Sequence, residues 1–330
     1  MNNLSLTAAM PDYDHARDLI TGRVSPEGID LTCLVLPVKE IFYRFIVYKE
    51  WEVSEISMAK YCSLLAQGDK SFVALPVFPS RVFRQGSLFV RRNGPVKKVS
   101  DLVGRRIGIP EWAQTAAVYS RGFLQHEYGI KPNQIRWLQG RANRLEHGLP
   151  PDVEVVQAAP GTELGDLLER GEIDFLMTAN NPLSFRRGSP NVRRLFPNYS
   201  ALEKDYYRRT KIYPIMHTVV IRRDIFDRDP WVALSLYKAF VRAKEYAFAL
   251  LSETGSPKAS FAWLQPMIEE EQEIIGRDWY PYGLGQNRPT IEALLQFTHE
   301  QGLSERKLTV EELFAPSTLK DIPLTEGQRV

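Results

Sequence analysis

Short apolar segments alternate with amphipathic segments along almost the whole chain, and this alternation constrains the fold more than any other feature. Such alternation is typical of an α/β fold with largely parallel sheets. We expect strands at Leu4–Ala8, Ile29–Leu36, Phe72–Phe78, Ser87–Arg91, Arg106–Pro110, Ile135–Leu138, Val153–Gln157, Ile173–Ala179 and Ile215–Ile221. We expect helices at Ser57–Gln67, Ala113–Tyr128, Leu164–Arg170, Pro230–Leu251, Met267–Ile275 and Thr290–Gln301.

Two extended, apolar stretches interrupt the pattern, at residues 74–96 and 209–226. The residues between them have the composition of a complete α/β unit. We therefore predict a discontinuous first domain (residues 1–93 and 219–330), a second domain inserted into it (residues 94–218), and two crossovers between them. A cleft between two such domains is where small ligands bind.

The helix expected at Ala113–Tyr128 has clear boundaries. Pro110 ends the strand before it, and Gly129 occupies the position after it that favours a left-handed conformation. Its first turn contains Thr115, and the free N–H groups of such a turn suit a carboxylate or a phosphate. The structural alternative is that Thr115 only caps its own helix.

Charged residues in the apolar crossovers are candidates for ligand contacts. Arg81 and Arg84 lie in PSRVFR, and a guanidinium group matches a carboxylate with two parallel hydrogen bonds. The alternative for each arginine is a salt bridge to a neighbouring Asp or Glu. His217 lies in PIMHTVVI, where it is either a satisfied core histidine or a proton donor that faces the cleft.

Other candidates follow the ends of strands, where ligands bind in open α/β sheets. Tyr13 and His15 come after the first strand, and Glu55 and Ser57 lie at a strand-to-helix turn. Asn180 follows a later strand. Each of them also has a structural alternative as a turn or cap residue.

Composition and motifs exclude several classes of function. The chain has 42 Lys and Arg against 40 Asp and Glu, so its charge gives no reason to expect nucleic acid. No apolar run approaches a membrane span, and the N-terminus lacks the features of a signal peptide. With only two cysteines, a cytoplasmic chain without a disulfide framework is expected.

The sequence also indicates no metal and no cofactor. The five histidines, His147 among them, show no metal-ligand spacing. There is no Walker loop, no G-x-G-x-x-G after a strand and no G-x-S-x-G elbow. We therefore expect a small molecule as the partner of the chain, and a homo-oligomer is compatible with the sequence.

Several stretches together resemble the 4,5-dihydroxyphthalate decarboxylase family, which has the type 2 periplasmic-binding-protein fold. The resemblance covers nearly the whole chain and lies in residues 13–31, 53–61, 75–84, 101–130, 171–176, 213–221, 281–293 and 311–316. It implies two lobes that close on a small aromatic carboxylate in phthalate catabolism. One residue departs from the family pattern, because Gln85 stands where members commonly have His in F-R-H.

The resemblance implies a reaction that needs no cofactor, because the ring hydroxyls make the substrate its own electron sink. We expect Arg81 to clamp the retained carboxylate, with help from the helix end at Thr115, and His217 to donate the proton. His15 is the second candidate for the acid, or the base that faces the phenol, with Glu55 as its orienting carboxylate. The remaining contacts are expected from Tyr13 and Trp112 on either side of the ring and from Ser57, Arg84, Asn180 and Arg121, the last of which either reaches the cleft or bridges to the other lobe.

Two alternatives remain at this stage. The chain could be a cytoplasmic protein that binds or senses an aromatic carboxylate without turnover, which Gln85 favours slightly. It could also be a precursor-synthesis enzyme of the same fold, like the thiamin-pyrimidine synthases, although the few histidines speak against this.

Overall fold

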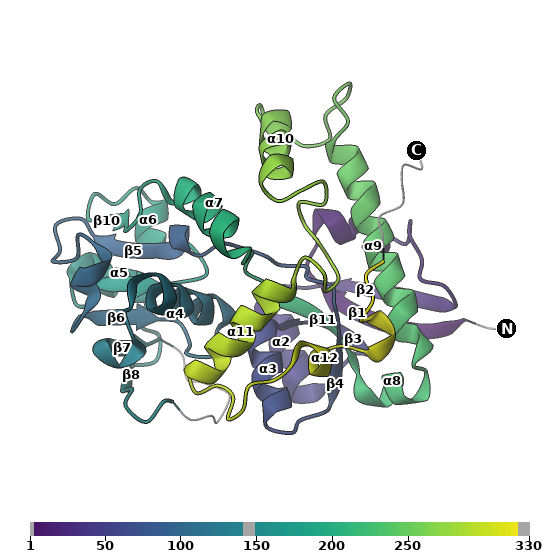
Figure 1. Cartoon of the computed structure of the whole chain (residues 1–330), viewed down its shortest axis with the longest axis horizontal. Helices are drawn as coiled ribbons and strands as arrows, with labels where there is room; N and C mark the ends of the chain where they lie inside the picture. The colour runs from purple at the N-terminus through teal and green to yellow at the C-terminus, as the bar shows by residue number, and fades with distance from the viewer. Residues whose placement is uncertain (1–2, 141–148, 323–330) are drawn as a thin grey trace.

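The structure, a computed structural model, describes residues 3–140 and 149–322. Its two β-sheets are the centres of two lobes that lie side by side (Figure 1). Apolar clusters lie on both faces of each sheet, where the helices cover it. The expected α/β class and the expected two-lobed architecture are therefore confirmed. His147 lies outside the described residues.

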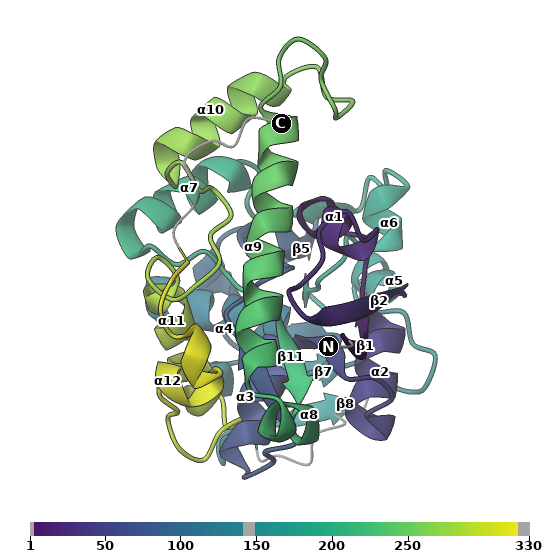
Figure 2. The ribbon, with the colours of Figure 1, turned by 90° about the vertical axis from the view of Figure 1, so that its right-hand side faces the viewer.

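The first sheet has five strands in the order β2-β1-β3-β11-β4. They are β1 (Leu4–Met10), β2 (Ile29–Val35), β3 (Val53–Ser57), β4 (Phe72–Leu75) and β11 (His217–Arg222). The helices of this lobe are α1 (Arg17–Ile20), α2 (Val38–Tyr48), α3 (Met58–Ala66), α8 (Arg223–Arg228), α9 (Trp231–Leu251), α10 (Leu264–Ile274), α11 (Arg288–Glu300) and α12 (Val310–Leu313). Figure 2 shows α9 running along the lobe, with α11 and α12 on one side of it and α1 and α2 on the other.

The second sheet has six strands in the order β10-β5-β9-β6-β7-β8. They are β5 (Leu88–Arg91), β6 (Arg106–Ile109), β7 (Arg136–Gln139), β8 (Val155–Gln157), β9 (Phe175–Met177) and β10 (Val192–Arg194). Its helices are α4 (Thr115–Tyr128), α5 (Leu164–Arg170), α6 (Leu183–Arg186) and α7 (Tyr199–Thr210). Short 3₁₀ turns occur at Asp14–Ala16, Gln85–Ser87, Val99–Leu102, Pro132–Gln134 and Pro316–Thr318.

The sheets are only partly parallel, and the crossovers explain why. Strands β1, β2 and β3 run parallel to one another, as do β6, β7, β8 and β9. In contrast, β11 is antiparallel to β3 and β4, and β5 is antiparallel to β9 and β10. Each of these two strands follows a crossover, so it enters its sheet at the edge where the parallel strands end.

The two crossovers pair with each other between the lobes. Arg81 and Ile215 form an antiparallel bridge, and the N–H of Met216 donates to the carbonyl oxygen of Ser80 at 2.8 Å. The first crossover ends earlier than the domain division at residue 93 implies, because β5 already belongs to the second sheet. Residues 76–87 therefore connect the two sheets.

Helix α11 packs against α3 of the first lobe and α4 of the second. Gly122 lies in the middle of α4, where a side chain would meet this neighbour: a Cβ atom at this position would lie 2.4 Å from a ring carbon of Phe297. The missing side chain therefore allows the two helices to approach closely.

The amphipathic pattern missed two of the longer helices, α2 and α7. Only Ile41 and Phe45 are buried in α2, and only Tyr206 and Tyr207 in α7. Each helix therefore presents only a narrow apolar stripe to the core. These helices matter for function, because α2 contributes Phe42 to the candidate site and α7 lines a cavity.

Gly122→Ala tests the close approach of α4 and α11. Alanine favours a helix over glycine by about 1 kcal/mol, but the clash with Phe297 costs about 1–3 kcal/mol, so we expect a net loss of stability. Denaturant unfolding of G122A, F297A and the double variant measures it. The double variant should lose less than the sum of the single variants, since truncation of Phe297 removes the clash. A stabilised G122A would contradict the observed packing.

Candidate active site

The site lies at one edge of the first sheet, where its strands meet the second lobe. Tyr13 follows the end of β1, Glu55 and Ser57 lie at the end of β3, and His217 begins β11. Because β11 runs antiparallel to β3, its first residue pairs with the last residue of β3, so that His217 lies opposite Ser57. The topology therefore brings together four of the residues that the sequence singled out.

Glu55 links two other members of this group, Tyr13 and His217. The side chain is fully buried, and its Oε1 atom accepts a hydrogen bond from the Tyr13 hydroxyl at 2.8 Å. The same oxygen contacts Nδ1 of His217. Its second oxygen, Oε2, is buried without a hydrogen-bond partner in the described structure. Burial, followed by the charge of Glu55, raises the pKa of Tyr13, which therefore remains a hydrogen-bond donor at neutral pH.

His217 is oriented on two sides and exposed on another. Phe42 of α2 lies edge-on to its ring, with the ring centroids 4.9 Å apart. The contact between Nδ1 and Glu55 leaves Nε2 as the nitrogen that can meet a ligand, and 17% of the side chain is exposed. A partly exposed imidazole held by a buried carboxylate suits proton transfer to a bound ligand.

His15 lies behind Tyr13, and both of its ring nitrogens are engaged. Nε2 is 3.1 Å from the carbonyl oxygen of Pro79, so it must be the protonated nitrogen, and Nδ1 then accepts from the Tyr282 hydroxyl at 2.7 Å. Burial lowers the pKa of His15. Its ring stacks on Tyr13 at 5.4 Å between centroids. The geometry therefore gives His15 a structural role in supporting Tyr13, and it leaves neither nitrogen for the acid or base role that the sequence suggested.

The N-termini of α3 and α4 come together beside this group. The Ser57 hydroxyl lies 2.8 Å from the Thr115 hydroxyl, and the N–H of Ala59 in the first turn of α3 donates to Thr115 at 3.1 Å. Neither helix is capped by the side chain of its own N-cap residue, Ser57 or Gln114. Thr115 thus bonds across the lobes instead of capping α4. Two positive helix ends face one region, which suits an anion.

An ion pair and an unpaired polar atom also mark this junction between the lobes. Lys60 of α3 forms an ion pair with Glu111, which precedes α4, at 2.6 Å, and both side chains are largely buried. The Oε1 atom of Gln114 is buried without a partner in the described structure. The junction therefore combines the N-termini of two helices with an unpaired amide oxygen.

The two crossover arginines, Arg81 and Arg84, donate to backbone carbonyls that do not belong to the His217 group. Arg81 donates from Nη1 to the carbonyl of Pro281 at 2.9 Å and from Nη2 to that of Tyr213 at 2.8 Å. Arg84 donates to the carbonyl of Ala179 at 3.1 Å, and burial lowers its pKa to about 10. Neither arginine forms an ion pair with a described carboxylate, so neither salt-bridge alternative is observed.

Trp112 and Arg121 belong to the core. The Arg121 guanidinium lies 3.8 Å from the centroid of the Trp112 ring and donates to Gln301, which follows α11, at 2.7 Å. Both residues are about 1% exposed. Arg121 therefore bridges to the C-terminal segment instead of reaching the cleft, and Trp112 does not flank it. Asn180, by contrast, is exposed after β9.

The sequence missed several residues of the site. Phe42 lies in α2, a helix that the sequence analysis did not predict. Tyr280 and Tyr282 lie far along the chain from the other residues of the site. Both tyrosines contact His15, one through its ring at 4.8 Å and one through its hydroxyl. The only available signal was that Tyr282 lies in a stretch that resembles the decarboxylase family, with Tyr280 directly before it.

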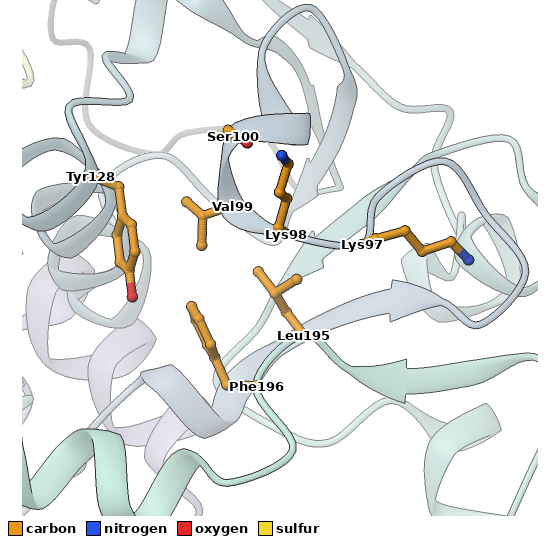
Figure 3. A pocket seen from close by; sticks show the side chains of 7 residues that line it. All are labelled: Lys97, Lys98, Val99, Ser100, Tyr128, Leu195 and Phe196. Atoms are coloured by element: carbon orange, nitrogen blue, oxygen red, sulfur yellow. The ribbon is translucent and has the colours of Figure 1, made fainter.

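One cavity of the second lobe lies away from this site. It measures about 450 Å³ and is lined by Lys97, Lys98, Val99, Ser100, Tyr128, Leu195 and Phe196 of the second lobe (Figure 3). Elsewhere, the described residues contain no cluster of three His, Cys, Asp or Glu side chains that could hold a metal ion. They also contain no helix whose length and hydropathy would let it span a membrane.

Solved structures with the same architecture define the fold. The chain is similar to the aliphatic sulphonate-binding protein SsuA of Escherichia coli, with 14% identity, a TM-score of 0.55 and coverage of 97% of this chain and 99% of that one. It is also similar to the putative SsuA of Methylobacillus flagellatus, with 13% identity, a TM-score of 0.58 and coverage of 97% and 94%. The fold is thus that of the two-lobed type 2 periplasmic-binding proteins.

Sequence comparison then identifies the family. The chain is 34% identical over 330 residues to the 4,5-dihydroxyphthalate decarboxylase of Comamonas testosteroni, covering 98% of this chain and all of that one. It is 34% identical over 215 residues to the enzyme of that name from Pseudomonas putida, covering 63% and 83%. No family model matches the sequence. The chain belongs to the 4,5-dihydroxyphthalate decarboxylase family, whose members are carboxy-lyases.

His15→Gln tests whether His15 is a buried neutral histidine. With a folded-state pKa below its ordinary value of 6.5, this residue binds fewer protons in the folded than in the unfolded chain. It therefore makes stability fall as the pH drops from about 7 through the unfolded-state pKa. The thermal unfolding midpoint of wild type should drop more steeply between pH 7 and pH 5 than that of H15Q. At pH 8, where His15 is neutral in both the folded and the unfolded chain, the difference in midpoint between the two proteins reports only the packing that H15Q loses. If the midpoints of wild type and H15Q fall in parallel with pH, the assignment is contradicted.

Proposed function

We propose that the chain converts 4,5-dihydroxyphthalate to protocatechuate and carbon dioxide without a cofactor, as a step of phthalate catabolism. The observation that carries the proposal is a partly exposed His217, held by buried Glu55, beside the paired N-termini of α3 and α4. Membership of the decarboxylase family supports the choice of substrate.

The chemistry needs few groups. Each carboxylate of the substrate is para to a hydroxyl group, so removal of the phenolic proton pushes electron density to the carbon that bears the leaving carboxylate. A proton is added to that carbon, the carbon–carbon bond breaks, and its electrons return to the ring as carbon dioxide departs. A base, an acid and a clamp for the retained carboxylate are sufficient.

The residues of the site divide these tasks. His217 delivers the proton to the ring carbon from Nε2, while Glu55 orients the imidazole through Nδ1. The unpaired Oε2 of Glu55 is the acceptor for a substrate hydroxyl. Ser57 and Thr115, with the N–H groups of the helix ends beside them, hold the retained carboxylate. The ring of Tyr13 forms one wall.

Gln85 gives the alternative of binding without turnover its only specific support. Its side chain is buried, and its Oε1 atom accepts the N–H of the preceding residue, Arg84, at 3.1 Å. This contact lies within the crossover and involves no member of the His217 group. The departure from the family pattern therefore leaves the proposed acid and its carboxylate in place, which favours turnover.

His217→Ala tests the acid. We expect kcat to fall about a hundredfold or more, because general acid catalysis is lost, while ligand binding persists. The rate of formation of protocatechuate and carbon dioxide from 4,5-dihydroxyphthalate gives kcat. A parallel reaction with EDTA tests whether turnover needs a metal ion. A thermal shift with the same ligand reports binding. An unchanged kcat would remove His217 from this role. A thermal shift of wild type without any product would instead favour a binding protein.

Glu55→Gln tests the positioning of His217. Glutamine preserves the shape of the side chain but removes the negative charge that faces the imidazole and weakens the acceptor for the substrate hydroxyl, so kcat should fall about tenfold or more and KM should rise by less than that. Ser57→Ala is the matched comparison, since it should raise KM more than it lowers kcat. A Glu55→Gln variant in which only KM changes would show that Glu55 binds substrate without acting through His217.

A further inference from the structure

The second cavity, of about 310 Å³, lies where the first crossover meets α7 and the start of the second crossover. Its lining includes Arg81, Arg194, Tyr199, Glu203 and Tyr213, and none of the lining residues belongs to the His217 group. The volume lies at the lower end of the range for small-molecule sites, which suits a ligand with a single ring.

Arg81 gives this cavity a buried positive charge that no described carboxylate neutralises. The residue is only 6% exposed. Its two terminal nitrogens donate to backbone carbonyls, and its guanidinium lies 4.0 Å from the centroid of the Tyr213 ring. Its Nε atom is buried without a hydrogen-bond partner. A buried charge with an unused donor is costly unless a ligand satisfies it.

Comparison with other buried cations shows what is particular to Arg81. Lys60 and Lys244 each form an ion pair, with Glu111 and Asp278. Arg121, like Arg81, is held by an aromatic ring and neutral oxygens and has an unpaired nitrogen, but it lines neither described cavity. Arg84 is also buried without an ion pair, but it has no buried unpaired nitrogen and lines neither cavity. Among the buried cations of the described residues, only Arg81 combines an unpaired donor with space for a ligand.

Arg194 adds a second guanidinium to the cavity. It donates to the carbonyl oxygen of Gly86 at 2.5 Å, and it lies 4.6 Å from the centroid of the Tyr199 ring. The one carboxylate in the lining, that of Glu203, accepts the N–H of Gly86 at 2.9 Å, and burial raises its pKa. The cavity is therefore positive on balance, and aromatic rings form part of its wall.

We propose that this cavity binds a single-ring aromatic carboxylate, whose oxygens meet Arg81 and Arg194 and whose ring lies against Tyr199 and Tyr213. Two sources share this chemistry. One is a separate molecule, such as the aromatic acid that the decarboxylation releases. The other is the substrate itself, with one of its carboxylates in the cavity. Binding at the cavity requires no turnover, so it can be tested independently of the proposed reaction.

Calorimetric titration with benzoate as the probe tests the cavity. Arg194→Gln removes one donor, and Val82→Trp fills the cavity from an exposed position on its lining while both arginines remain. Arg187→Gln, at an exposed position outside the lining, is the matched control. We expect wild type and R187Q to bind benzoate alike, and R194Q and V82W to lose a site or bind about tenfold more weakly.

Two readouts distinguish the sources. A separate ligand gives two benzoate sites per chain in wild type and one in V82W, and protocatechuate then inhibits wild type noncompetitively. A carboxylate of the substrate gives one benzoate site and a KM for 4,5-dihydroxyphthalate that rises in both variants. Thermal unfolding shows whether R194Q keeps its fold. If R194Q does not fold, the results for V82W alone decide whether the cavity binds the carboxylate. Benzoate binding, inhibition and KM that are the same in V82W, R187Q and wild type would overturn the proposal.

Discussion

The site depends on the contacts that the buried carboxylate of Glu55 makes with Tyr13 and His217. A charge in the interior of a protein costs several kcal/mol unless hydrogen bonds or an opposite charge compensate it. Here the compensation comes from Tyr13, after β1, and His217, at the start of β11. These two residues are more than two hundred positions apart in the chain, so Glu55 has both partners only when the sheet is formed. Fold and site are thus coupled through one side chain.

The junction of the lobes supplies the second half of the site. Helix α3 belongs to the first lobe and α4 to the second, yet Ser57 and Thr115 connect their first turns directly. Lys60 and Glu111 add an ion pair at the same junction. Helix α11 packs on both helices, and the absence of a side chain at Gly122 lets it approach. The relative position of the helix ends, and with it the proposed carboxylate clamp, therefore depends on packing that involves three separate stretches of chain.

The buried arginines have partners within the protein that the sequence did not reveal. For Arg81 the sequence suggested a carboxylate from either a ligand or the protein, and for Arg121 either a place in the cleft or a bridge to the other lobe. In the structure, their protein partners are backbone carbonyls, a side-chain amide and aromatic faces. These partners come from Tyr213, Pro281, Trp112 and Gln301, which lie far away in the sequence or are uncharged, so no local pattern could reveal them. A similar limit applies to His15, whose partners, Pro79 and Tyr282, are equally distant.

The sequence by itself determined the α/β class and the two crossovers, and it singled out Tyr13, Glu55 and Ser57 after or at the ends of strands and His217 within a crossover. The class and the first three residues depend on local hydrophobic periodicity and on the rule that ligands bind at the carboxyl ends of strands. Only the tertiary structure decided which candidates meet. It placed His217 on Glu55, turned His15 into a support for Tyr13, and directed Arg81 toward a separate cavity. The physical reason is that hydrogen bonds and ion pairs between distant segments depend on strand order and register, which the pattern of a single segment does not contain.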